Sequence, residues 1–109
     1  MLSGPIAAHG IAIMSQREGL AFETQVRSDS TALHGVVADM LAVYPGLHVL
    51  RDPTRGGVAS ALNEIARAAP CGIRIEQSTI PISEEVQGAC EILGLDPLYV
   101  ANEGVLIAI

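Results

Sequence analysis

Lysine is absent from this sequence, and all 6 of its basic residues are arginines. The absence excludes two kinds of site within the chain: a phosphate-binding loop built on a lysine, and a lysine that forms a Schiff base. Acidic residues outnumber basic ones by 12 to 6, which gives a formal net charge of -6. Because nucleic acids and many membranes are themselves negatively charged, we expect neither as the main partner.

Aromatic residues and cysteines are nearly as rare. Tryptophan does not occur and aromatic residues make up 3% of the chain, so the core must be built from Ala, Val, Ile and Leu. The 2 cysteines, Cys71 and Cys90, have neither the spacing of a zinc site nor the density of a secreted disulfide scaffold. We expect both to be small buried residues in a cytoplasmic protein.

Long hydrophobic runs are also missing. Hydrophobic residues make up 50% of the chain, yet no apolar stretch approaches the roughly 20 residues of a membrane helix. The first residues lack the basic and apolar regions of a signal peptide. With 109 residues the chain corresponds to at most one domain. Its high apolar content suggests that another domain or a second copy covers part of the surface.

Hydrophobic periodicity alternates between helix and strand along the chain. It predicts helices at about 8–17, 31–44, 57–69 and 84–93, an extended loop at 20–28, and strands at 47–50, 72–76 and 105–109. We expect Gly19 and Gly94 to close the first and last helices, Asp29 or Ser30 to cap the second, and Ser83 to cap the last. No repeat or linker divides residues 1–109, so the pattern predicts one α/β (α+β) domain.

The most informative stretch is Arg51-Asp52-Pro53-Thr54-Arg55-Gly56-Gly57, between the 47–50 strand and the next helix. The two glycines leave room for a phosphate at the backbone, and the positive end of the helix dipole favours an anion there. The two arginines add positive charge, and Asp52 could hold a metal ion or a proton. The alternative is an ordinary turn, with Thr54 or Asp52 as the N-cap and the glycines needed only for backbone geometry.

Five segments together resemble a known family; they are residues 9–13, 50–57, 62–66, 88–91 and 93–104. They are similar to the HypE family of hydrogenase maturation proteins, in the PurM-like superfamily related to AIR synthase. The resemblance covers the whole chain and implies a truncated C-terminal domain of that fold, with a mixed sheet covered by helices. One departure is that Ala7 and Ala8 stand where family members usually have Gly-Asp.

The resemblance implies an ATP-dependent carbamoyl dehydratase. Family members use ATP with Mg²⁺ to convert a thiocarboxamide on a C-terminal cysteine into a thiocyanate, for the cyanide ligands of [NiFe] hydrogenase. Their partners are the carbamoyltransferase and the iron-carrying scaffold complex of hydrogenase maturation. Because the chain lacks the family's N-terminal ATP domain and terminal cysteine, we expect it to be inactive alone.

The resemblance also implies roles for particular residues. Glu103 matches the acid near the reacting cysteine and is expected to act as a base, although a solvated turn acid is the alternative. For His9 a cap or packing role is the alternative to a place in the cleft. The expected roles are Glu103 and Asp52 as catalytic residues, Thr54, Arg55, Gly56 and Gly57 as phosphate-binding residues, His9 and Asn102 as other cleft residues, and no metal ligands.

Two further interpretations stay open. The chain could be a free-standing, non-catalytic module that keeps the fold and binds itself or a partner. Because the 105–109 strand would expose an unpaired edge, we expect a homodimer or a larger symmetric assembly. A phosphate-metabolite binder related to the purine-synthesis members of the superfamily is the third interpretation.

Overall fold

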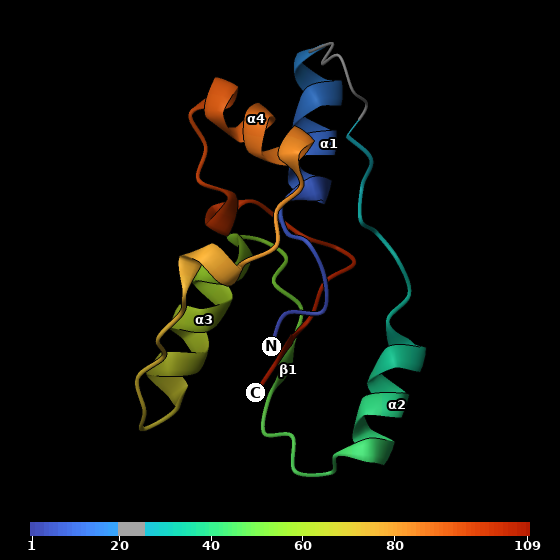
Figure 1. Ribbon diagram of the computed structural model, residues 1–109, viewed down its shortest axis with the longest axis vertical. Coiled ribbons are helices and arrows are strands. Elements are labelled where there is room, and N and C mark those ends of the chain that lie inside the picture. Colours follow the sequence, from blue (N-terminus) through green and yellow to red (C-terminus); the bar gives the residue numbers. More distant parts are fainter. Residues whose placement is uncertain (20–25) are drawn as a thin grey trace.

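The computed structural model describes residues 1–19 and 26–109. In this part of the chain, four α-helices surround a small antiparallel sheet, which confirms the expected fold class (Figure 1). The expected loop at 20–28 lies partly outside the described residues. The elements are α1 (Ala8–Glu18), α2 (His34–Val43), β1 (Leu50–Arg51), α3 (Gly57–Ala68), α4 (Glu84–Leu93) and β2 (Ile107–Ala108), with short 3₁₀ helices η1 (Gln77–Thr79) and η2 (Pro97–Tyr99).

The ends of α1 and α4 are set by local sequence, as expected. Gly19 and Gly94 follow these helices with φ angles of 64° and 65°, a left-handed conformation that glycine adopts without steric cost. The Ser83 hydroxyl accepts a hydrogen bond from the amide of Val86, 3.4 Å away, at the start of α4. The three predicted caps are therefore confirmed.

The expected caps of α2 and α3 are wrong. Leu33 precedes α2 without a side-chain hydrogen bond, and Gly56 precedes α3 in place of Thr54 or Asp52. Asp29 instead accepts hydrogen bonds from amide groups near residue 103. A distant backbone thus takes up the carboxylate that local sequence assigned to a helix.

The strand expected at 72–76 is also absent from the structure. These residues have no regular secondary structure, and most of them, including Ile75 at 47% exposure, face solvent. Alternating sequence forms a stable strand only where a neighbouring strand supplies hydrogen bonds, and no described strand lies beside this segment.

The short sheet joins the two ends of the chain. β2 pairs with β1 in an antiparallel register that places Leu50 opposite Ala108. On its other side β2 bridges to Leu2, and the amide of Ala108 donates to the Met1 carbonyl at 3.0 Å. The final apolar run is buried, as expected. The unpaired edge predicted for it is wrong because the N-terminal residues cover that side.

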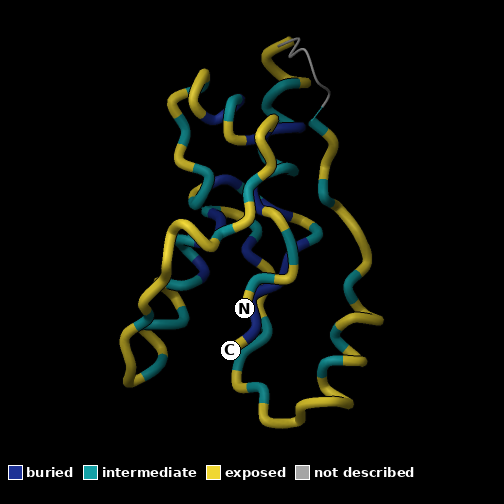
Figure 2. Tube along the Cα trace, in the orientation of Figure 1, coloured by how far each residue is buried: buried dark blue, intermediate teal, exposed yellow. Residues whose placement is uncertain are grey.

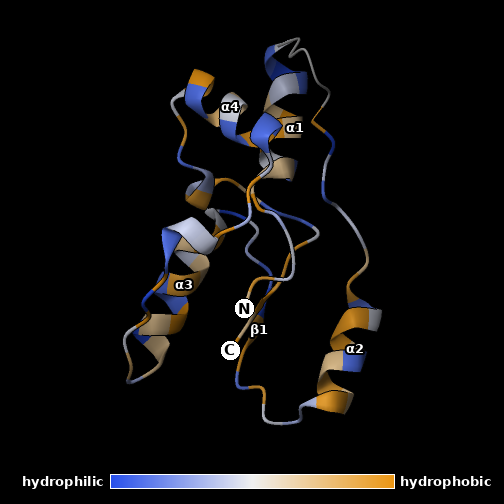
Figure 3. Ribbon diagram, viewed as in Figure 1, coloured by the Kyte–Doolittle hydropathy of each residue, from blue (hydrophilic) through white to orange (hydrophobic). Residues whose placement is uncertain are grey.

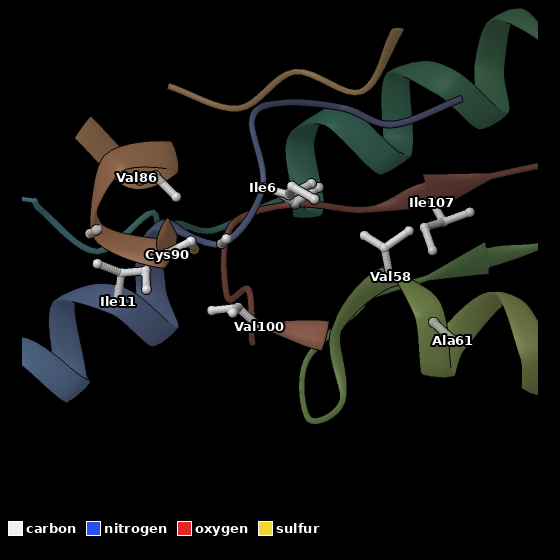
Figure 4. Close-up of a cluster of buried hydrophobic side chains, with 11 residues drawn as sticks. Ile6, Ile11, Val58, Ala61, Val86, Cys90, Val100 and Ile107 are labelled. Carbon is white, nitrogen blue, oxygen red and sulfur yellow. The ribbon is translucent and has the colours of Figure 1, made fainter. Parts of the chain in front are cut away.

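The core is aliphatic, as the scarcity of aromatic residues requires. α1 packs against α4, and α3 packs against η2. Figure 4 shows one group of core side chains from α1 and α4 and another from α3 and β2, with Ile6 and Val100 between them. The fully or almost fully buried members of the two groups are Ile11, Val86, Cys90, Val58, Ala61 and Ile107.

Helix α2 differs from the other helices because none of its residues is buried. Figure 1 shows it apart from the rest of the fold, and Figures 2 and 3 show that it is largely exposed yet hydrophobic. Val43 is 84% exposed and Leu41 46%. A pocket of about 470 Å³ lies between α2 and the sheet, lined by residues that include Met40, Tyr44 and Ala108. The described part of this chain therefore does not cover the apolar residues of α2. Among the described residues, no helix combines the length and hydrophobicity needed to cross a membrane.

The two cysteines occupy opposite environments. Cys90 is fully buried on α4, as expected, whereas Cys71 is exposed, so that expectation was wrong. Burial raises the pKa of the Cys90 thiol, and the negative charges of Asp96 and Glu91 raise it further. The thiol therefore stays protonated at neutral pH.

We predict that iodoacetamide at pH 8 modifies Cys71 at least ~100-fold faster than Cys90, because only an accessible thiolate reacts. Mass spectrometry of the labelled peptides measures both rates. Since the folded-state pKa of Cys90 is raised, its contribution to stability is complete below the unfolded-state pKa of about 8.5 and is lost as the pH rises through the folded-state value. Equal labelling rates in the native protein would contradict the buried position, and the Cys71→Ser variant isolates the Cys90 signal.

Candidate functional site

Asn102 lies where three segments of the candidate site meet, and its side chain is fully buried. Its side-chain oxygen accepts a hydrogen bond from the amide of Ala7 at 2.6 Å. Its side-chain nitrogen donates to the carbonyls of Pro53 and Val100 at 2.9 and 3.1 Å. A single amide side chain therefore joins the start of α1, the loop of residues 51–57 and the C-terminal segment. Asn102 supports the site from below, since it exposes no surface to a ligand.

Two glycines let the helices approach this junction closely. The amide of Gly10 donates to the Ala101 carbonyl at 3.0 Å, and a Cβ on Gly10 would collide with Val100. A Cβ on Gly57 would lie 2.7 Å from the Val100 carbonyl oxygen and would also meet that of Leu98. The N-terminal ends of α1 and α3 thus rest directly on the 98–101 backbone.

The 51–57 loop forms a glycine-containing turn at the start of α3. Gly56 and Gly57 have φ angles of 79° and 64°, so the chain needs glycine at both positions. The loop is closed by a hydrogen bond from the amide of Gly57 to the Thr54 carbonyl at 3.0 Å. Asp52 and Arg55 are exposed beside it. The first-turn amides of a helix lack intrahelical partners and can donate to an anion.

The two arginines of the loop have different surroundings. Arg51 forms an ion pair with Glu64 of α3, with 2.6 Å between the guanidinium nitrogen and the carboxylate oxygen. Both side chains are about half exposed, at 47% and 60%, so the pair adds little stability. Within residues 1–19 and 26–109 no ion pair engages Arg55. Among the described residues, Arg55 is therefore the arginine of this loop whose charge no carboxylate neutralises.

Glu103 is an exposed residue on a turn that hydrogen bonds to Pro53 and to Asp29 hold in place. It follows Asn102, whose backbone amide donates to the Pro53 carbonyl at 3.3 Å. This bond places the turn formed by Asn102, Glu103 and Gly104 beside the 51–57 loop. From the side, the Asp29 carboxylate accepts from the amides of Glu103 and Gly104 at 3.1 and 2.9 Å. Among the described residues no hydrogen bond engages the Glu103 carboxylate.

His9 lies in the first turn of α1, half-buried, with its Nδ1 2.9 Å from the Ser28 hydroxyl oxygen. It lines a pocket of about 340 Å³ together with Gly10, Asp96 and Tyr99. The contact with Ser28 ties the 28–29 segment to α1. His9 therefore borders a cavity next to the Asn102 junction and also serves a packing role.

Ala7 adopts the left-handed conformation, with a φ of 75°, at the N-cap of α1. This conformation costs a non-glycine residue about 1–2 kcal/mol. The hydrogen bond from its amide to Asn102 holds it in place. Glycine would adopt this conformation without strain, so the alanine at position 7 is the less favourable residue for this backbone.

Sequence reasoning missed the residues that support the site. Asp29 and Ser28 lie in a Ser-Asp-Ser stretch that is typical of a helix N-cap, and nothing local indicates that residue 29 contacts residues 103 and 104. Arg51 and Glu64 are 13 positions apart, across a loop whose geometry the sequence does not specify. In the described part of the chain, no group of three or more His, Cys, Asp or Glu side chains forms a cation site.

Comparison with known proteins gives a consistent result. The family described as AIR synthase related protein, C-terminal domain, matches residues 1–109. The chain is 59% identical over its full length to the carbamoyl dehydratases HypE of Cupriavidus necator and Azotobacter vinelandii, and covers 31% and 32% of them. Thus the chain spans about a third of the length of these relatives.

Solved structures show the same similarity. HypE in complex with ATP superimposes with a TM-score of 0.94 at 48% identity, over 98% of this chain and 32% of that one. The HypE chain of a HypE–HypF complex also gives a TM-score of 0.94, at 44% identity, with 99% of this chain and 36% of that chain covered. The fold is therefore that of HypE over this region.

We predict that Asn102→Ala lowers the free energy of unfolding by about 3 kcal/mol, because it leaves the Ala7 amide and the Val100 carbonyl buried without their partner. Urea denaturation measures the loss. The control is Asn63→Ala on α3, where an exposed side chain donates only to the Ala59 carbonyl; we expect a change below ~1 kcal/mol there. Equal effects of the two substitutions would contradict the central role of Asn102.

Proposed function

Since this chain belongs to the AIR synthase related protein family, through part of its C-terminal domain, we propose that it is the portion of a HypE-type carbamoyl dehydratase that faces the reaction cleft. The proposed reaction dehydrates a thiocarboxamide on a cysteine to a thiocyanate, at the expense of ATP. The observation that supports the proposal is that the hydrogen bonds of Asn102 hold the 51–57 loop beside the exposed Glu103. Alone, the chain is proposed to be inactive, because it spans about a third of its relatives.

The 51–57 loop is proposed to receive the phosphates of ATP. Gly56, which is only partly buried, is proposed to let a phosphate approach the backbone at the start of α3, and Arg55 supplies a positive charge. Gly57 is buried and its amide already donates to the Thr54 carbonyl, so its proposed part is to shape the turn. Thr54 lies at the turn and adds a hydroxyl. Asp52 contributes one exposed carboxylate, and Mg²⁺ commonly takes one or two carboxylates together with phosphate oxygens and water. The donor set thus suits a magnesium nucleotide that a second part of the protein also contacts.

Glu103 is proposed to remove an amide proton during dehydration. An amide oxygen leaves only after activation, which ATP supplies by phosphorylation, and two N–H protons must then be taken up to form the nitrile. A base needs a fixed position within hydrogen-bond reach of the proton. The Glu103 backbone is held on both sides, by Asn102 and by Asp29, while its carboxylate faces outward unpaired. Asp52, which precedes Pro53 in the neighbouring loop, is proposed to assist as a second carboxylate that takes up a proton.

The proposed partners follow the same relatives. A HypE protein has been solved with HypF, and we propose that this chain serves in a protein that meets a carbamoyltransferase of that kind and the iron-carrying scaffold complex. The two unpaired cysteines agree with a reducing cytoplasm.

A second candidate function is an assembly module that forms a homodimer. The observation that favours it is α2, whose apolar residues find no cover within the described chain. Exposed apolar patches of this kind often mark interfaces between proteins. A dimer is therefore proposed from α2. It no longer follows from an unpaired edge of the C-terminal strand, because that edge is paired.

We predict that magnesium ATP binds the 51–57 loop and that binding weakens about 10-fold or more in Arg55→Ala and Asp52→Asn, because each removes a charge at the phosphates. Isothermal titration calorimetry on the purified chain measures the affinity. Arg67→Ala is the matched control, since Arg67 is exposed at the far end of α3. The absence of heat up to millimolar nucleotide would rule out an autonomous phosphate site on this chain.

We also predict that the chain is a dimer at micromolar concentration and that Leu41→Asp makes it monomeric, because a charge on α2 cannot be buried at an apolar interface. Multi-angle light scattering measures the mass. Ile92→Asp on α4, where the side chain is 75% exposed, is the control and should leave the dimer intact. A monomeric wild-type chain would contradict the assembly proposal.

A further inference from the structure

Asp29 makes an unusual use of its carboxylate. One oxygen, Oδ2, accepts hydrogen bonds from two successive amides, those of Glu103 at 3.1 Å and Gly104 at 2.9 Å. Glu103 and Gly104 lie 74 and 75 positions after Asp29 in the sequence. Charge-assisted bonds from a carboxylate to backbone amides are about twice as strong as neutral ones. The turn that carries Glu103 is therefore clamped by a segment that belongs to no helix or strand.

The local packing is built to admit this clamp. A Cβ on Gly104 would collide with the Asp29 carbonyl oxygen, so glycine at this position allows the two backbones to meet. The neighbouring Ser28 hydroxyl lies 2.9 Å from His9 Nδ1 and accepts from the Ser30 amide at 3.1 Å. The segment that carries Asp29 is thereby fixed to α1.

The clamp is costly, which argues against a purely stabilising role. The second carboxylate oxygen of Asp29, Oδ1, is buried and has no hydrogen-bond partner among the described residues. Burying an acceptor without a partner is unfavourable, because its hydrogen bonds to water are lost and not replaced. Asp29 combines this unfavourable burial with two bonds to the turn that carries Glu103. Its role is therefore better explained by the position that it gives this turn than by added stability.

We propose that Asp29 is a positioning residue for Glu103: by holding the amides of residues 103 and 104, it sets the direction in which the Glu103 carboxylate leaves the turn. This inference rests on the proposed function of Glu103 as the base. Asp29 need not touch substrate or nucleotide. Because a misplacement of about 1 Å at a reacting group lowers the rate up to ~100-fold, the effect should appear in catalysis.

The first test measures the clamp itself. Backbone amide hydrogen exchange at Glu103 and Gly104 is followed by NMR in wild type, Asp29→Ala, Asp29→Asn and Ser30→Ala. Asp29→Ala should speed exchange at both amides about 10-fold or more, since it removes their acceptor. Asp29→Asn keeps a side-chain carbonyl oxygen and should restore most of the protection, and Ser30→Ala should change nothing. Unchanged exchange in Asp29→Ala would overturn the proposal.

The second test measures ATP-dependent dehydration in the full-length native protein with its maturation partners, by mass spectrometry of the modified cysteine. Asp29→Ala should lower kcat about 10-fold with the KM for ATP unchanged, and Asp29→Asn should recover most of that loss. A higher KM at unchanged kcat, or full kcat despite faster exchange, would reduce Asp29 to a structural role and overturn the inference. Full activity in Glu103→Gln would instead overturn the proposed base, so the two failures are distinguishable.

Discussion

The whole arrangement depends on one buried amide side chain. Asn102 meets one demand from each of three segments, an amide from Ala7 and carbonyls from Pro53 and Val100. Without this side chain the Ala7 amide and the Val100 carbonyl would be buried without a partner, at a cost of about 1–3 kcal/mol each. An amide side chain is the natural solution, because it both donates and accepts. Replacing it by Asp or by an apolar residue would leave at least one segment without its bond.

Around this junction, the remaining features of the site are adjustments of distance. Gly10 and Gly57 remove the side chains that would keep two helices away, and the strained φ of Ala7 lets its amide face Asn102. The result brings four segments, at 7–10, 28–29, 52–57 and 100–104, to one surface. The groups that would contact ligands, Arg55 and Glu103, remain exposed on it. A site that stabilises a charged transition state requires charged groups held at fixed positions. The proposed site would meet this requirement, since the Asn102 junction fixes the backbone and Arg55 and Glu103 are exposed on it.

Local sequence predicted those parts of the fold that depend on few neighbours. The glycine ends of α1 and α4 and the Ser83 cap rest on contacts within one turn of the chain, and they were correct. The need for glycines in the 51–57 loop was also predicted from sequence. For Gly57 the fold adds a second reason, because a Cβ there would collide with the backbone of residues 98–100. Asp29 was misassigned because a helix cap and a remote turn ask for the same chemistry. The strand predicted at 72–76 failed for a related reason, since alternation indicates a need for a neighbouring strand without supplying one. The helix predicted at 31–44 does form, as α2, although none of its residues is buried.

The pairing of the chain ends has a consequence for how the polypeptide reaches its fold. The amide of Ala108 donates to the Met1 carbonyl at 3.0 Å, across 107 positions of sequence, and the Asn102 bonds also form only once the last segment is present. Contacts between such distant residues form late and slow the search for the native state. While a ribosome is still synthesising residues 100–109, the N-terminal segment has neither its β partner nor its buried amide. The apolar residues around Ile6 stay uncovered until that segment is made, and transiently exposed apolar surface of this kind favours aggregation.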